Sequence, residues 1–279
     1  LMIRRPPRST RKEASAASDV YKRQFGTPEF DELYERYERA TSIPKTKVSA
    51  RDLFTDLLKE RAETGRIYIM NIDHCNSHSS FQDKINMSNL CQEITLPTDP
   101  IQHIDGKGEI ALCILSAINV GIIKLEEMSN LCDLAVRGLE ELIDYQEYPV
   151  RAAEKSTKAR RSLGIGYIGL AHFLAKNKVE YGSPESLELV HELTESFQYH
   201  LLCSSNQLAS DKGACSGFSS TKYAAGQLPI DHYKSDVDTL GKFKYKCDWE
   251  KLRTRVKVHG PVSYTHLRAH ETSLHLVCR

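Results

Sequence analysis

The chain has 279 residues and a formal net charge of +1. No run approaches the roughly 18 apolar residues of a membrane span, and the cysteines are scattered without the short-range pairing of a disulfide framework. We therefore expect a cytoplasmic protein, long enough to form one large domain or part of one.

The two ends of the chain differ from its body. Residues 1–24 carry seven basic and two acidic residues without apolar periodicity, and residues 261–279 are similarly unpatterned. Both ends look like translated sequencing adapters, so we expect them to be disordered artefacts. A basic nucleic-acid-binding arm is the alternative for residues 1–24, whereas a targeting peptide is excluded because no apolar region follows the charges. The body, residues 25–260, has 29 Lys and Arg against 34 Asp and Glu, hence a net charge of −5. This balance argues against nucleic-acid binding through bulk charge.

In the first half of the body, apolar spacing and cap residues predict two helices and two strands. In chain order they are a short helix within residues 25–37, a helix from the N-cap Ser49 to Gly65, a strand at residues 66–72 and a near-continuous apolar strand at residues 109–120. A polar loop, residues 73–87, follows the first strand and leads to Cys91, and a second polar loop after Pro97 precedes the other strand. A strand that is apolar along its whole length is typical of a sheet buried on both faces.

The second half is predicted to be mostly helical. Residues 125–145 carry an apolar stripe, Ser183 and Pro184 form an N-cap and N1 pair before a long helix that ends at Gly213, and residues 249–259 form a last amphipathic helix. Strands with long intervening helices indicate the α/β class.

The stretch Ser88–Ile94 (SNLCQEI) carries the most useful chemistry. If its backbone is extended, Asn89, Cys91 and Glu93 share one face, because side chains two apart point to the same side of a strand. An amide, a thiol and a carboxyl group can bind a hydroxyl, act as a nucleophile or one-electron reagent, and move a proton. The alternative is that Cys91 is a small buried hydrophobic residue.

Three other arrangements compete with this site. His74, Cys75 and His78, with Cys91, could hold zinc, although no CxxC pair supports them. Residues 164–169 match GxGxxG, but no strand is predicted before them, and we expect these glycines to let a helix start pack closely. Finally, Cys91 could be a hydrolase nucleophile with His74 or His78 as its base.

A resemblance decides between these alternatives. The body resembles the large (alpha) subunit of class I ribonucleotide reductase in several motifs that occur in order along the chain. These are GTPEF at residues 26–30, HCN at 74–76, SNLCQEI at 88–94, GEIALC at 108–113 and RRSLGIG at 160–166. Trp249, Leu252 and Gly260 match the opening of that family's signature.

The resemblance implies an α/β fold, as part of a ten-stranded barrel made of two halves, with a central finger loop that carries the radical cysteine. Cys91 matches that cysteine, Glu93 the base that deprotonates the 3′ hydroxyl, and Asn89 the residue that binds the substrate hydroxyls. Leu90 and Gln92 complete the substrate-binding stretch.

Cys113 matches one of two cysteines that reduce the substrate, and its partner is expected upstream of Phe25. The remaining cysteines of the body are expected to be structural; they are Cys132, Cys203, Cys215 and Cys247.

The resemblance also implies the partners of the full-length subunit. The substrate is a ribonucleoside diphosphate, the radical comes from a metal-containing small (beta) subunit, and the external reductant is thioredoxin or glutaredoxin. This segment binds no metal or cofactor of its own, ATP and deoxynucleotide effectors bind elsewhere, and the full-length subunit is a homodimer that binds neither nucleic acid nor membrane. The segment alone is expected to be inactive. A non-catalytic remnant or interaction domain is the second hypothesis, and an adenosylcobalamin-dependent relative a minor one.

Overall fold

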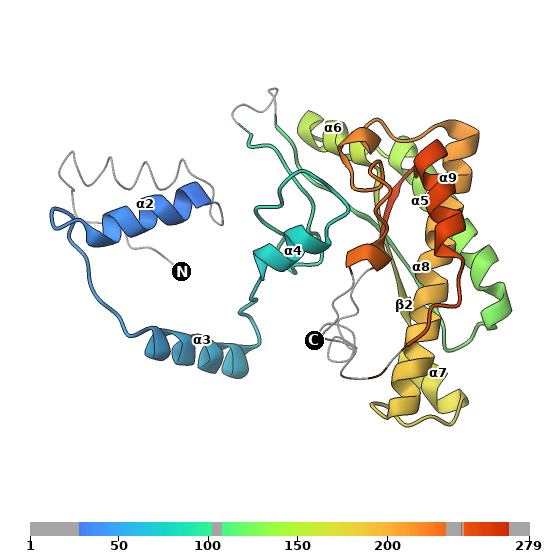
Figure 1. Cartoon of the computed structure of the whole chain (residues 1–279), viewed down its shortest axis with the longest axis horizontal. Coiled ribbons are helices and arrows are strands. Elements are labelled where there is room, and N and C mark those ends of the chain that lie inside the picture. Colours follow the sequence, from blue (N-terminus) through green and yellow to red (C-terminus); the bar gives the residue numbers. More distant parts are fainter. Residues whose placement is uncertain (1–27, 102–107, 233–240, 242, 268–279) are drawn as a thin grey trace. The chain divides into compact units, whose positions relative to one another are not determined.

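The computed structural model describes residues 28–101, 108–232, 241 and 243–267 (Figure 1). These residues fall into two compact units. The first unit runs to Asn76 and includes Leu90–Gln92, and the second comprises Ser77–Asn89 and the chain from Glu93 onward.

The first unit contains α2 (Pro28–Arg39), α3 (Ala50–Thr64) and the start of α4 (Ile72–His78). The caps of α3 are those predicted: Ser49 Oγ accepts from the backbone N–H of Asp52 at 3.3 Å, and Gly65 ends the helix in the left-handed region at φ 64°. No residue of α3 is buried.

The strand predicted at residues 66–72 is wrong, and so is the loop predicted from residue 73. Residues 66–71 form no ladder with any described strand, and α4 begins at Ile72. The β-rich sequence RIYIMN leaves Tyr68 and Ile69 exposed. A sequence with high β propensity forms a strand only where a neighbouring strand accepts its backbone hydrogen bonds.

The second unit is built on a parallel sheet in the order β1 (Ile114–Asn119), β2 (Ser162–Ile168), β3 (Tyr264–Leu267). Leu115 pairs with Gly164, and Gly164 pairs in turn with His266. Every residue of the central strand β2 except the last is buried. The parallel order with intervening helices confirms the α/β class, and β1 lies inside the predicted apolar strand at residues 109–120.

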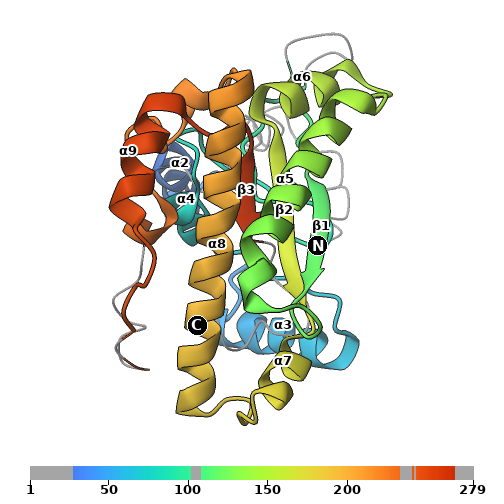
Figure 2. The same ribbon diagram turned by 90° about the vertical axis from the view of Figure 1, so that its right-hand side faces the viewer.

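The helices of this unit are α5 (Met128–Tyr145), α6 (Arg151–Arg160), α7 (Leu170–Lys176), α8 (Pro184–Lys212) and α9 (Trp249–His259), with short 3₁₀ turns at Leu125–Glu127, Phe218–Ser220 and Pro229–His232. Figure 2 shows α5 and α8 side by side across one face of the sheet. The main core lies between these two helices and the sheet, and its members include Val136, Ile143, Leu163, Ile165, Phe197 and Leu201.

The predicted long helix is α8. Ser183 Oγ accepts from the backbone N–H of Ser186 at 3.1 Å, Pro184 occupies the first turn, and Gly213 follows the last helical residue. The far end of α8 packs against α9, and a second apolar cluster fills this contact with Phe81, Leu96, Leu202, Tyr223, Trp249 and Leu252.

The expectation that residues 261–279 are disordered is wrong for residues 261–267. Val262 is 3% exposed, and its backbone N–H donates to the carbonyl of Ser205 at 3.1 Å. Ser205 Oγ donates to the carbonyl of Ser263 at 2.7 Å. These contacts hold Val262 and Ser263 against α8, immediately before β3, which pairs with β2. Residues 1–24 and 268–279 lie outside the described residues.

None of the helices that the structure describes is long and apolar enough to cross a lipid bilayer.

Candidate active site

The stretch Ser88–Ile94 forms a turn. Leu90 and Cys91 occupy the turn, and Gln92 has a φ of 59°, in the left-handed region. The extended backbone on which we based the shared face of Asn89, Cys91 and Glu93 is therefore wrong. A left-handed residue between Cys91 and Glu93 breaks the alternation of a strand, which sequence spacing alone does not reveal.

Two side chains close the base of this turn. Asn89 Oδ1 accepts from the backbone N–H of Ile94 at 3.0 Å, and Ser88 Oγ donates to the carbonyl of Ile94 at 2.7 Å. Ser88 Oγ also donates to Asn89 Oδ1 at 3.2 Å. The residues that lead into and out of the turn are thus held together in the second unit, and Leu90–Gln92 connect them.

The thiol and the carboxyl group of the stretch have different environments. Cys91 is exposed and forms no disulfide, so its sulfur is accessible to a reactant. Glu93 is half-buried, and its Oε2 is buried without a hydrogen-bond partner among the described residues. A buried carboxylate oxygen without a partner costs free energy, which a bound hydroxyl group would recover.

Cys113 lies immediately before β1 and is half-buried. A Cβ atom on Gly164, in the neighbouring strand β2, would lie 2.8 Å from Cys113 Sγ. Glycine at this position therefore makes room for the thiol. Cys113 packs against the second apolar cluster, and so does Ile94, the residue that follows Glu93. The two segments therefore meet at the same cluster.

The glycines of GxGxxG do not begin a helix together, contrary to our expectation. Gly164 and Gly166 lie within β2, and only Gly169, at φ 80°, is the N-cap of a helix, α7. A helix of seven residues follows that glycine. Strand β2 contains the first two glycines of the motif instead of ending before them. This is not the arrangement of a dinucleotide fingerprint, in which the strand precedes the glycines.

The zinc alternative gains no support from the described residues. His74, Cys75 and His78 lie on α4 rather than on a loop. Burial, with the charge of Asp73, raises the pKa of the Cys75 thiol and so disfavours the thiolate that zinc requires. Among the residues that the structure describes, no three His, Cys, Asp or Glu side chains are grouped to hold a metal ion.

The cysteines expected to be structural include one deep in the core. Cys132 on α5 is fully buried, and burial raises the pKa of its thiol to about 12. Burial, with the nearby Glu195 carboxylate, raises the pKa of Cys247 to about 11. Thiols with such pKa values are poor nucleophiles at neutral pH.

An ion-pair group joins two segments that flank the stretch Ser88–Ile94 in the sequence. Arg160 Nη2 lies 3.0 Å from Glu109 Oε2 and 3.4 Å from Asp83 Oδ2. The adjacent Arg161 contacts α5 instead, through Glu140 and through Asp144 Oδ2 at 2.7 Å. Both arginines belong to the motif RRSLGIG, and Glu109 belongs to GEIALC. The sequence shows both motifs but does not predict the contact between them, because 51 residues separate Glu109 from Arg160.

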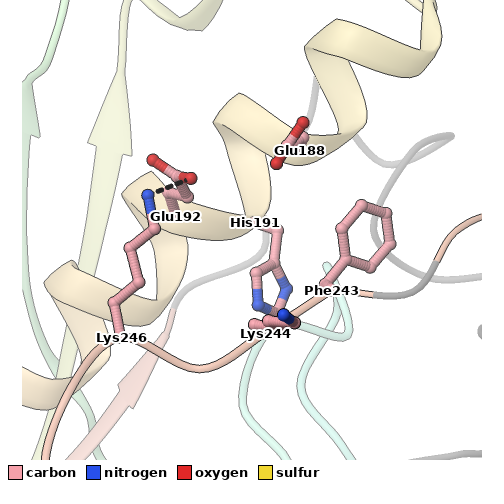
Figure 3. Close-up of a pocket in the computed structure, with 6 residues that line it drawn as sticks. All are labelled: Glu188, His191, Glu192, Phe243, Lys244 and Lys246. Carbon is pink, nitrogen blue, oxygen red and sulfur yellow. Dashed lines mark ion pairs between the residues drawn. The ribbon is translucent and has the colours of Figure 1, made fainter.

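A pocket of about 290 Å³ lies away from these residues, between α8 and residues 243–246 (Figure 3). The rings of His191 and Phe243 stack with their centroids 4.9 Å apart, and Lys246 forms an ion pair with Glu192. None of the predicted site residues lines this pocket.

Fold and site together define an α/β protein with a thiol and a carboxyl group on one tight turn. Comparison with known proteins identifies the family: a family model described as "Ribonucleotide reductase, barrel domain" matches residues 7–269. The chain belongs to this family.

Curated relatives agree with this assignment. The chain is 50% identical over 236 residues to the ribonucleoside-diphosphate reductase subunit alpha of Buchnera aphidicola subsp. Schizaphis graminum. It is 50% identical over 237 residues to the ribonucleoside-diphosphate reductase 1 subunit alpha of Escherichia coli K12, and 41% identical over 237 residues to the subunit alpha of Enterobacteria phage T4. Each match covers 83% of this chain and 31% of the relative, so the chain spans about a third of the length of these relatives.

Proposed function

We propose that this chain is a segment of the catalytic subunit of a ribonucleoside-diphosphate reductase and carries its radical thiol, Cys91. The observation that best supports the role of the turn is the buried, unpartnered Oε2 of Glu93, two residues from an exposed thiol. The relatives at 50% identity support the reaction and its substrate class. In the full-length subunit the segment forms part of a ten-stranded α/β barrel, with residues 88–94 as its finger loop.

The chemistry requires these residue types. As a thiyl radical, Cys91 takes the hydrogen atom from C3′ of the ribose, an exchange that is nearly balanced because the S–H bond and the activated C–H bond have similar strengths. Glu93 accepts the proton of the 3′ hydroxyl, and Asn89 hydrogen-bonds the substrate hydroxyls. The 2′ hydroxyl then leaves as water with a proton from one of two redox thiols, and these two thiols also supply the electrons and the hydrogen that replace it at C2′. Glu93 returns the proton to the 3′ oxygen, and Cys91 returns its hydrogen atom to C3′.

The reduction consumes two electrons, which come from two thiols that finish as a disulfide. Cys113 is one of them, and the other is expected upstream of Phe25. An external dithiol of the thioredoxin or glutaredoxin type reduces the disulfide by exchange. A metal-containing small subunit supplies the radical, the full-length subunit is a homodimer, and its location is cytoplasmic.

The test is a chimaera in which residues 28–260 replace the matching segment of the Escherichia coli subunit. With the small subunit and a dithiol reductant it should reduce ribonucleoside diphosphates. Cys91→Ser should abolish turnover and leave substrate binding unchanged within about twofold, because it removes only the hydrogen-atom acceptor. Turnover by Cys91→Ser would overturn the radical assignment.

Cys132→Ser serves as the control, since that thiol is buried in the core and has no proposed role. It should retain turnover. A chimaera that folds and binds nucleotide but never turns over would instead favour the second hypothesis, a non-catalytic remnant.

A further inference from the structure

Arg160, at the end of α6, contacts segments on both sides of the turn. Its guanidinium group pairs with Glu109 at 3.0 Å and with Asp83 at 3.4 Å, and it lies over the ring of Phe81 with its Cζ 5.8 Å from the centroid. The side chain of Arg160 is 13% exposed and that of Glu109 is 8% exposed. This pair is therefore largely shielded from solvent, where an ion pair is screened least.

Glu109 connects this ion pair to the segment that leaves the turn. Its Oε2 accepts from the backbone N–H of Asp99 at 3.3 Å, and its own N–H donates to the carbonyl of Asp99 at 3.1 Å. The next residue is also attached to α6, because the N–H of Ile110 donates to the carbonyl of Ala152 at 3.3 Å. Glu109 and Ile110 are thereby attached to α6, and Asp99 is held to Glu109 by two hydrogen bonds.

The segment that enters the turn is held by the same guanidinium group. Asp83 is one of its carboxylate partners, and the adjacent N–H of Gln82 donates to the carbonyl of Ser220 at 3.0 Å. The whole reactive stretch, including Asn89 and Glu93, lies between Asp83 and Glu109 in the sequence. One arginine therefore closes a loop of chain that contains that stretch, and restricting the two ends of a loop reduces its conformational freedom.

Cys113 follows Glu109 by four residues. We propose that Arg160 is a positioning residue: through Glu109 and Asp83 it fixes the two ends of the segment that carries Asn89, Cys91 and Glu93, together with the chain that leads to Cys113. The effect on the redox chemistry of this site rests on the proposed function, whereas the effect on the local structure does not.

The first experiment measures thiol reactivity in the 279-residue chain. Iodoacetamide labelling with site-resolved mass spectrometry should show that Arg160→Met speeds alkylation of Cys113 about tenfold, because the segment before it opens more often. The buried Cys132 should stay protected, and the rate at the exposed Cys91 should not change. Glu109→Gln should act like Arg160→Met, and the double variant should add little, since both changes break one interaction. Arg160→Lys should give partial rescue, because lysine keeps the charge and loses the forked contact.

The adjacent arginine provides a matched control. Arg161→Met removes ion pairs to Glu140 and Asp144 on α5 and should leave the alkylation rate of Cys113 unchanged. The proposal is overturned if Arg160→Met leaves the Cys113 rate unchanged. It is also overturned if Cys132 becomes reactive to the same extent, or if Arg161→Met has the same effect, because Arg160 then acts only on the fold as a whole.

The second experiment uses the reductase chimaera described above. Arg160→Met should lower kcat about 100-fold, with KM for the nucleotide nearly unchanged, since misplacing reacting groups affects the chemical step more than binding. If KM for the nucleotide instead rose by a similar factor, the result would contradict a positioning role for Arg160. If Cys91→Ser kept turnover, the proposed function would fail while the labelling result on Arg160 would still stand, so the two failures are distinguishable.

Discussion

The thiol of Cys113, a proposed redox residue, fits beside β2 because residue 164 is a glycine and has no Cβ atom. A Cβ atom on Gly164 would lie 2.8 Å from Cys113 Sγ and 2.5 Å from Leu115 Cδ2. Leu115 and Gly164 are register partners on adjacent strands, so neither backbone can move away without disturbing the ladder. The glycine is therefore needed for packing around the thiol rather than for backbone freedom.

Gly164→Ala is expected to lower the free energy of unfolding by about 2 kcal/mol, the cost of overpacking a filled core. Chemical denaturation measures this change. Gly138→Ala on α5 is the control, because nothing lies within 4 Å of its added Cβ and alanine favours a helix interior, so it should stabilise the protein by about 0.5–1 kcal/mol. Equal effects of the two substitutions would contradict this account of Gly164.

At the scale of elements, α8 fixes the start of α9 through one buried carboxylate. Glu195 Oε1 accepts from the backbone N–H groups of Lys246 and Cys247, each at 3.0 Å, and from Trp249 Nε1 at 2.9 Å. Trp249 is the first residue of α9, and its ring meets that of Tyr199 edge-on with centroids 5.4 Å apart. The Glu195 carboxylate on α8 therefore binds three donors in the segment that leads into α9.

Glu195→Gln should lower the free energy of unfolding by about 2 kcal/mol, because it replaces charge-assisted hydrogen bonds with weaker ones and brings an NH₂ group toward donors. Trp249 is the chain's single tryptophan, so a red shift of its fluorescence reports the loosened contact directly. Glu192→Gln, one turn earlier and in a partly exposed pair with Lys246, should cost less than about 0.5 kcal/mol and leave the emission unshifted. A red shift in the control as well would show that Trp249 does not report on Glu195.

For the second unit as a whole, residues 261–267 complete one side of the central strand. β3 pairs with β2 from Ser162 to Ile165, and Val262 and Ser263 are anchored on α8 before the strand begins. Without β3, the buried strand β2 would have an open edge.

A chain that stops after Gly260 should therefore be less stable by about 3 kcal/mol, from the lost burial of Val262 and the lost hydrogen bonds to Ser205. Thermal denaturation compares it with a chain that stops after Leu267, which should be the more stable of the two by that amount. If both truncated chains melted together, β3 would contribute nothing to stability.

The sequence by itself determined the helices with clear ends. Ser49 with Gly65, and Ser183 with Gly213, mark α3 and α8 because caps and apolar spacing act within a few residues. The order of the motifs also determined the family, which the comparisons confirm. The roles of Asn89, Cys91, Glu93 and Cys113 stay predictions.

Only the tertiary structure decided the features that depend on distant partners. Residues 66–71 have strand propensity without a partner strand, whereas residues 264–267 form a strand because β2 accepts them. Gln92 adopts a left-handed conformation where the alternation of side chains predicted an extended strand. Arg160 pairs with Glu109, which lies 51 residues earlier in the sequence. The physical reason is the same in each case: strand pairing, loop conformation and buried ion pairs gain their free energy from contacts that folding makes between residues far apart in sequence.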